Sequence, residues 1–230
     1  MKILVVGSCT KLKKYKHNNE PTCQDINTKN DRKKFVQKYS NFSCKASLMY
    51  KGQQHKSIIK AINLLEEISE VDYYIISAGY GLINCEEEIS SYECSFSKMK
   101  NVDIIRRSNL LEIKKDFKQI LKSNYDLIYL ALGKKYLLAI PEWENLCDCL
   151  TIAFTHVKNN NIICLDGSKH SVLKFKKQDF TIHGIIGFKG DLLEIIAKKI
   201  LSLNNPSKFL KNTLNNKSNF QTFINRDILK

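Results

Sequence analysis

The sequence predicts an α/β fold, a single compact domain with a mostly parallel central sheet flanked by helices. Largely apolar runs of strand length at 3–7, 72–77 and 126–132 alternate with longer segments of helical periodicity. Strands that are buried on both faces are typical of parallel sheets covered by helices. Each run also ends in a small, polar turn. A chain of 230 residues is long enough to bury the core of such a domain.

The first half of the chain carries two of these strands. After the strand at 3–7, residues 12–46 are rich in Lys, Asn and Asp, which predicts a long loop with one short helix near 31–39. Apolar residues at helical spacing then predict a helix over 54–70. The strand at 72–77 follows. The expected buried positions of the helix are Ile58, Ile59, Ile62, Leu65 and Ile68.

The second half continues the alternation of helices and strands. A helix is expected over 102–122, before the strand at 126–132 and a short helix directly after it. Two further strands are expected at 151–155 and 161–165, and the last strong helix at 190–203. The expected buried positions of the first of these helices are Ile104, Ile105, Leu111 and Ile120.

The C-terminal segment differs in composition from the rest. Residues 204–230 contain a single acidic residue, Asp227, and a weak Leu/Phe pattern. We therefore expect an α/β domain over 1–203 and a basic appendage or terminal helix over 204–230. The basic residues of this appendage include Lys208, Lys211, Lys217, Arg226 and Lys230.

The chain is strongly basic, with 37 Lys and Arg against 23 Asp and Glu, a formal net charge of +14. Such a balance predicts an acidic partner, with nucleic acid ahead of an anionic membrane surface. A lysine-rich proteome would give the same balance without any partner. No apolar run reaches the roughly 18 residues of a membrane-spanning helix.

The eight cysteines are too sparse for a disulfide scaffold, and no C-x-x-C motif occurs. We expect free thiols in a reducing cytoplasm and no metal site. The sequence also lacks a Walker A loop and a dinucleotide-binding glycine motif. No cofactor is therefore expected.

Three strand-end turns form the most informative constellation. They lie at 7–11, 77–81 and 133–136, and each combines small residues with lysine or tyrosine. Ligands of open α/β sheets bind outside the carboxyl ends of the strands. Small residues there let backbone N–H groups approach an anion. One such turn is an ordinary strand-to-helix connection, but three at one edge predict a site.

Residues 75–83 (IISAGYGLI) and 88–99 (EISSYECSFSKM) are similar to the central signature of the YaaA family of peroxide-stress proteins. That signature is a strand, a Ser-(Gly/Ala)-x-Tyr-Gly-Leu turn, an acidic spacer and a Tyr-led motif that ends in Met. Residues 46–52, 130–136 and 187–193 resemble further motifs of the family in the same order.

This resemblance extends over roughly residues 1–203 and implies a compact α/β fold with a positively charged cleft that binds DNA. More distant relatives imply nucleobase excision, including phage-defence glycosylases that remove glucosylated hydroxymethylcytosine. The sequence departs from the family pattern at Glu93, Leu130 and Lys189, where the family has Arg, Asn and Arg. An acid in place of a base at position 93 points to different chemistry.

Three carboxylates are candidates for catalysis. Breaking an N-glycosidic bond passes through an oxocarbenium-like sugar, which a nearby carboxylate stabilises. Glu93 is favoured because it follows Tyr92 in the signature loop and lies outside any apolar face. A solvated loop glutamate would look the same. Asp126 and Asp166 are further candidates, although capping or turn formation explains them more simply.

A base in duplex DNA must be flipped out and stacked on aromatic groups. Tyrosines that flank the strand-end turns suggest such a pocket. The expected substrate-binding residues are Ser8, Lys11, Tyr50, His55, Ser77, Tyr80, Tyr92 and Tyr136. The basic residues expected to contact DNA phosphates are Arg106, Arg107, Lys134, Lys135 and Lys189.

Three functions agree with these observations. The first is a DNA glycosylase that excises a modified base and leaves an abasic site. The second is a non-catalytic DNA-binding stress protein of the YaaA type. The third is a transferase that acts on free nucleosides, for which the high positive charge has no purpose. The oligomeric state is not predicted.

Overall fold

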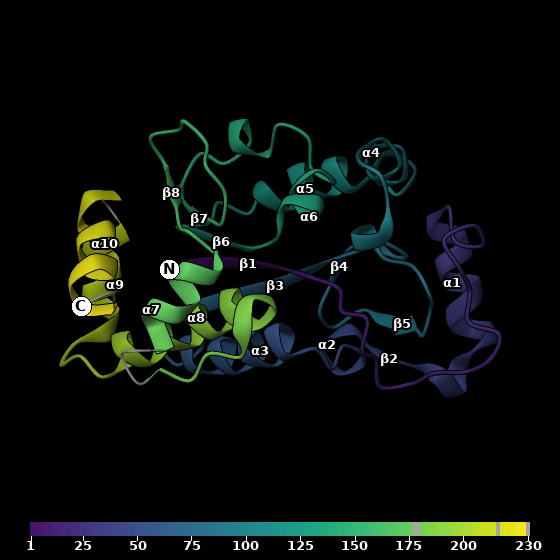
Figure 1. Ribbon diagram of the computed structural model, residues 1–230, viewed down its shortest axis with the longest axis horizontal. Coiled ribbons are helices and arrows are strands. Elements are labelled where there is room, and N and C mark those ends of the chain that lie inside the picture. Colours follow the sequence, from purple (N-terminus) through teal and green to yellow (C-terminus); the bar gives the residue numbers. More distant parts are fainter. Residues whose placement is uncertain (177–179, 215–216, 229–230) are drawn as a thin grey trace.

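A computed structural model describes residues 1–176, 180–214 and 217–228. Within these ranges a central sheet has the strand order β4-β3-β1-β6-β7-β8, with a separate β2-β5 pair beside it (Figure 1). The strands are β1 (Lys2–Ser8), β2 (Ser43–Lys45), β3 (Glu70–Ser77), β4 (Gly81–Asn84), β5 (Glu88–Ser90), β6 (Leu127–Ala131), β7 (Leu150–Ala153) and β8 (Ile162–Cys164). All neighbours in the central sheet pair in parallel except β4, which pairs antiparallel with β3. The predicted α/β fold with a mostly parallel sheet is confirmed.

Helices cover both faces of this sheet. In Figure 1, α3 and α8 lie below the sheet while α5 and α6 lie above it. The helices are α1 (Lys29–Lys38), α2 (Ala46–Met49), α3 (Gln53–Leu65), α4 (Asn101–Leu110), α5 (Ile113–Leu121), α6 (Lys134–Leu137), α7 (Lys169–Lys176), α8 (Gly184–Leu201), α9 (Pro206–Leu214) and α10 (Lys217–Phe223). None of the helices in the described ranges has the length and apolar character that crossing a bilayer requires.

The strand β1 lies at the centre of the sheet because its side chains are apolar on both faces. It pairs in parallel with β3 on one side and β6 on the other. Its residues Ile3, Leu4, Val5 and Val6 are fully buried. The continuous apolar run in the sequence therefore marks the most protected strand of the fold.

The helix expected over 102–122 is two helices, α4 and α5. The helical conformation is interrupted at Glu112, whose φ of 53° lies in the left-handed region. Leu111 before it is fully buried, so the break turns an apolar side chain into the core. Ile105, expected to be buried, is instead 38% exposed on α4. Apolar periodicity does not reveal such a break, since both helices keep a buried face.

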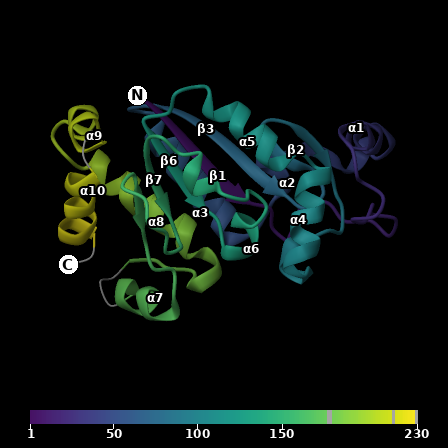
Figure 2. The same cartoon turned by 90° about the horizontal axis from the view of Figure 1, so that it is seen from above.

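The helix α8 begins at Gly184, six residues before the expected start at 190. Three glycines in its first two turns hide it from the sequence pattern, because glycine disfavours helix. Packing against α3 overrides that preference, and the two helices lie side by side in both views (Figures 1 and 2).

The C-terminal segment forms α9 and α10, followed by a π-helical turn (Ile224–Ile228). Figure 1 places these helices at the β8 end of the sheet. Their apolar side chains belong to the same hydrophobic core as the sheet, while Lys208 and Lys211 are exposed. The buried members are Leu210, Phe220, Phe223, Ile224 and Ile228.

Gly190 allows α8 to pack closely against α3. A Cβ atom at this position would overlap the backbone carbonyl group of Gln54. We expect Gly190→Ala to lower the free energy of unfolding by about 1–3 kcal/mol, because backbone atoms cannot move aside as a flexible side chain can. Urea denaturation measures the change.

Gly133→Ala is the matched control for this substitution. Gly133 has a φ of −86° and no atom within 4 Å of an added Cβ. We expect its stability to change by less than about 0.5 kcal/mol. Equal losses in both variants would show that helix–helix contact is not what requires glycine at position 190.

Candidate functional site

The carboxyl ends of β1 and β6 form a topological switch point. The chain leaves β1 toward β3 on one side, and leaves β6 toward β7 on the other. Ligands of open α/β sheets bind at such points. Ser8 and Cys9 follow β1 here, and Gly133 and Tyr136 follow β6. Two of the three predicted turns therefore lie beside each other.

Polar groups at this switch point form hydrogen bonds with one another. The Cys9 thiol lies 3.1 Å from the Tyr136 hydroxyl. The amide Nε2 of Gln54, on α3, donates to the carbonyl of Ala131 at 2.9 Å and to Ser8 Oγ at 3.4 Å. Burial raises the pKa of the Tyr136 hydroxyl, which keeps it protonated.

Tyrosine and serine hydroxyls form a second network at the end of β3. The Tyr50 and Tyr92 hydroxyls lie 2.9 Å apart, and Ser77 Oγ donates to Tyr92 at 2.8 Å. Tyr80 lies 2.6 Å from Ser90 Oγ. Four of the residues expected to bind substrate, at positions 50, 77, 80 and 92, thus lie close together.

The same three tyrosine rings are in the core and not on an open surface. Tyr50, Tyr80 and Tyr92 are each at most 1% exposed, and burial raises the pKa of all three hydroxyls. The prediction that Tyr80 and Tyr92 stack on a flipped base is therefore wrong for this conformation. None of the three lines the lysine-rich pocket described next.

The pocket itself lies over Tyr92 and has a volume of about 330 Å³. The ammonium group of Lys13 lies 4.3 Å from the centre of the Tyr92 ring. This volume is at the lower end of the range of about 300–1,000 Å³ found for ligand pockets. The residues that line it are Lys11, Leu12, Lys13, Tyr15, Lys16, Glu20 and Glu93. Of the predicted site residues, Lys11 and Glu93 belong to it.

Backbone pairing holds the lysine-rich wall of the pocket in place. The amide of Lys14 donates to the carbonyl of Met49 at 2.7 Å, and the amide of Lys51 donates to the carbonyl of Leu12 at 2.9 Å. Lys13 consequently pairs antiparallel with Tyr50. This extended conformation turns Lys13 inward and leaves Lys14 exposed.

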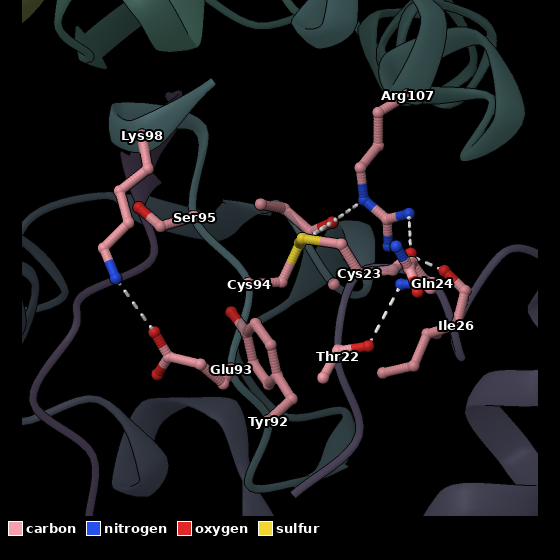
Figure 3. Close-up of a disulfide and its surroundings, with 12 residues drawn as sticks. Thr22, Cys23, Gln24, Ile26, Tyr92, Glu93, Cys94, Ser95, Lys98 and Arg107 are labelled. Carbon is pink, nitrogen blue, oxygen red and sulfur yellow. Dashed lines mark hydrogen bonds and ion pairs between the residues drawn. A yellow bond between two sulfur atoms is a disulfide. The ribbon is translucent and has the colours of Figure 1, made fainter.

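Glu93 provides a carboxylate at the opposite wall of the pocket. Its side chain is 50% exposed and its Oε1 lies 3.4 Å from Lys98 Nζ (Figure 3). Its backbone amide donates to the carbonyl of Pro21 at 2.9 Å, and residue 93 pairs with Thr22. The backbone at residue 93 is thus fixed on the segment that precedes α1.

A disulfide between Cys23 and Cys94 lies directly beside Glu93 (Figure 3). The Cα atoms are 5.0 Å apart, and the two cysteines lie 71 positions apart in the chain. The prediction of free thiols is wrong for this pair, because sequence spacing carries no information about such a distant contact. The other six cysteines, all in described ranges, are free.

Arg107, expected to contact DNA, is instead a buried structural residue. Its guanidinium donates to the carbonyls of Ala78, Cys23 and Ile26, and to the side chain of Asn27 (Figure 3). It is 6% exposed, and burial lowers its pKa to about 10. It joins α4 to the turn after β3 and to the segment that carries Cys23.

His55, expected in the substrate pocket, is also buried. Its Nδ1 lies 2.9 Å from the hydroxyl of Tyr73, and its Nε2 lies 2.9 Å from the carbonyl of Ser47. Burial lowers the pKa of the imidazole, which is therefore neutral. Protein groups take up both ring nitrogens, so the prediction of substrate contact is wrong.

The three candidate carboxylates do not converge. Asp126 precedes β6 and accepts a hydrogen bond from the amide of Lys2 at 2.7 Å, at the amino edge of the sheet. Asp166 follows β8, at the far end of the sheet from β3. It accepts bonds from Ser168 and Ser171, which lower its pKa. The contacts of Asp126 and Asp166 are thus structural, which leaves Glu93 as the candidate catalytic carboxylate.

The other residues expected to contact DNA differ in their exposure and in the contacts that they already make within the protein. Lys134 and Arg106 are exposed, and Arg106 pairs only at 3.9 Å with Asp103. Lys135 donates to the carbonyls of Ser97 at 2.9 Å and Met99 at 2.7 Å. Lys189 lies 5.5 Å from the ring centre of Phe154, and burial lowers its pKa.

Sequence reasoning missed Lys13 and Tyr15. The segment Leu12-Lys13-Lys14-Tyr15-Lys16 falls in the loop expected over 12–46, because it is charged and lacks apolar periodicity. The available signal was its position, since it directly follows the first strand-end turn. Alternation of inward and outward side chains in an extended segment then places residues 13 and 15 on one side.

The fold and the site define an α/β protein with helices on both faces of the sheet and a basic pocket near its carboxyl edge. Residues 35–159, more than half of the chain, match the model of a family of unknown function, DUF6884. The chain belongs to this family. Comparisons with curated proteins and with solved structures gave no match. The matched range includes β3, β6 and Glu93, and begins after Lys13.

Proposed function

We propose that the protein binds DNA and excises a modified nucleobase by cleaving its N-glycosidic bond, which leaves an abasic site. The observation that carries this proposal is the Glu93 carboxylate on the wall of a pocket lined by lysines. In glycosidic cleavage, positive charge develops on the sugar. A carboxylate beside it stabilises that charge or activates the attacking water.

The surroundings of Glu93 support a nucleic-acid substrate. Lys11 and Lys16 are exposed at the pocket, where they would meet DNA phosphates. Tyr15 is a partly buried aromatic residue in the same pocket, which suits stacking on an extruded base. The net charge of +14 adds affinity for DNA of any sequence.

The proposed substrate is glucosylated hydroxymethylcytosine in phage DNA. This choice rests on the resemblance of residues 75–99 to the YaaA family and its base-excising relatives. We also propose a cytoplasmic location, where such DNA is encountered. The Cys23–Cys94 disulfide is unusual for that reducing compartment.

Incubating the purified protein with unmodified, hydroxymethylated and glucosylated phage DNA tests the proposal. Alkali then cleaves the DNA at abasic sites, and mass spectrometry identifies any released base. We expect strand breaks and a free modified base with glucosylated DNA only. DNA that is bound but stays intact in all three samples would contradict base excision.

Two observations favour a second candidate, DNA binding without catalysis. Lys98 pairs with Glu93, as an ordinary surface lysine would. In addition, the rings of Tyr50, Tyr80 and Tyr92 are closed off from an incoming base. This candidate predicts the same salt-dependent affinity for all three DNA samples and no released base.

A further inference from the structure

Lys13 is the residue of the pocket whose environment the proposed base excision leaves unexplained. Its side chain is partly buried, and its ammonium group lies 4.3 Å from the centre of the Tyr92 ring. It forms no ion pair with any residue in the described ranges, although Glu20 and Glu93 line the same pocket. A surface lysine would extend into solvent.

The neighbouring lysine shows how unusual this position is. Lys14 is exposed, and its ammonium group lies 4.8 Å from the ring of Tyr15. Both side chains thus carry one charge and contact one tyrosine ring. They differ in that Lys13 points into the pocket and Lys14 does not.

Burial also changes the acid–base chemistry of Lys13. Desolvation lowers the pKa of its ammonium group, and Cys9, Glu20 and Glu93 oppose this shift only in part. A lower pKa increases the fraction of neutral amine near pH 7. The neutral amine is the nucleophilic form, and desolvated lysines form imines with carbonyl compounds.

We propose that Lys13 is an amine nucleophile that condenses with the aldehyde of an abasic deoxyribose, which gives the protein a DNA strand-cleaving activity. The inference rests on the proposed function for the source of the aldehyde. Excision at Glu93 produces an abasic sugar, and Lys13 lines the same pocket. The product of the first reaction therefore forms within the pocket that holds the amine.

The chemistry balances without any further reagent. The Nζ of Lys13 attacks C1′ of the ring-opened sugar, the carbonyl oxygen leaves as water, and an imine forms. A base then removes a proton from C2′. The C3′–O bond breaks, a C2′=C3′ double bond forms, and the 3′ phosphate departs with the electron pair. Water hydrolyses the imine and restores the amine.

Borohydride trapping tests the proposal independently of base excision. The full-length protein is mixed with an oligonucleotide that already contains one abasic site, and sodium borohydride reduces any imine to a stable amine. We expect a covalent protein–DNA adduct on a denaturing gel. Peptide mass mapping should locate the adduct on Lys13.

Lys13→Gln and Lys14→Gln form a matched pair of variants. Both remove one charge and one ring contact from the same segment. We expect the trapped adduct to fall by at least about tenfold in Lys13→Gln, because the nucleophile is lost, and to persist in Lys14→Gln. Circular dichroism checks that both variants fold. If one variant does not fold, the peptide that carries the adduct in the unaltered protein still shows whether Lys13 is the nucleophile.

Three outcomes would overturn the proposal: no adduct with the unaltered protein, an adduct mapped to another residue, or an undiminished adduct in Lys13→Gln. Released base without an adduct would leave the proposed function standing and remove only this inference. An adduct on Lys13 without any base release from modified DNA would support the lysine nucleophile and remove the proposed base excision. The two claims therefore fail separately.

Discussion

Replacing Glu93 by glutamine is expected to slow base excision by at least about 100-fold, the lower range for removing a catalytic acid or base. Glutamine keeps the volume of the side chain and removes its negative charge, so charge developing on the sugar loses its stabilisation. DNA affinity should change by less than about threefold, since phosphate contacts supply most of it. Single-turnover excision and salt-dependent binding measure the two effects.

Glu20→Gln is the matched control for Glu93→Gln. Glu20 lines the same pocket, and its replacement removes the same charge. We expect a loss of excision below about tenfold, because a change in the general field of the pocket is weaker than loss of a positioned group. Equal losses in the two variants would assign the effect to pocket charge and remove Glu93 as the catalytic carboxylate.

Removing the Cys23–Cys94 disulfide is expected to have the largest effect on stability. For two cysteines 71 residues apart, loss of the cross-link lowers the free energy of unfolding by about 4 kcal/mol through the entropy of the unfolded chain. Cys23→Ser combined with Cys94→Ser, followed by guanidinium denaturation, measures this loss. Excess reductant should produce a similar shift in the unaltered protein.

Cys44→Ser provides the comparison for the disulfide variant. Cys44 is a free, partly buried cysteine of β2, in the same half of the molecule. We expect its replacement to cost less than about 1 kcal/mol. If reductant leaves the denaturation midpoint of the unaltered protein in place, the cross-link contributes nothing to stability.

The sheet was the part of the structure most open to prediction. The strands β1, β3 and β6 contain largely apolar runs, and the full burial of Ile3 and Val6 follows from the continuous apolar run in β1. The break at Glu112 and the early start of α8 were not predictable. Each depends on tertiary packing that overrides local preference, at Leu111 and at Gly190.

The site was predicted less completely than the fold. Glu93 was found because a charged residue in a polar loop reaches solvent, and it does line the pocket. Tyr92 and Arg107 were misplaced because a tyrosine or arginine near a turn has the same sequence context whether it points inward or outward. Lys13 was missed because a run of lysines is usually solvated on all sides.

The contact between α3 and α8 also sets the position of a polar side chain at the switch point. Gln54, whose backbone would collide with any Cβ at position 190, is the residue that reaches Ala131 and Ser8 at the switch point. A larger residue at 190 moves α3 outward and draws the Gln54 amide away from both partners. The clash is with the backbone of residue 54, so it does not depend on the side chain at that position. A single substitution in α8 can therefore rearrange the polar contacts at the strand ends without changing any residue that makes them.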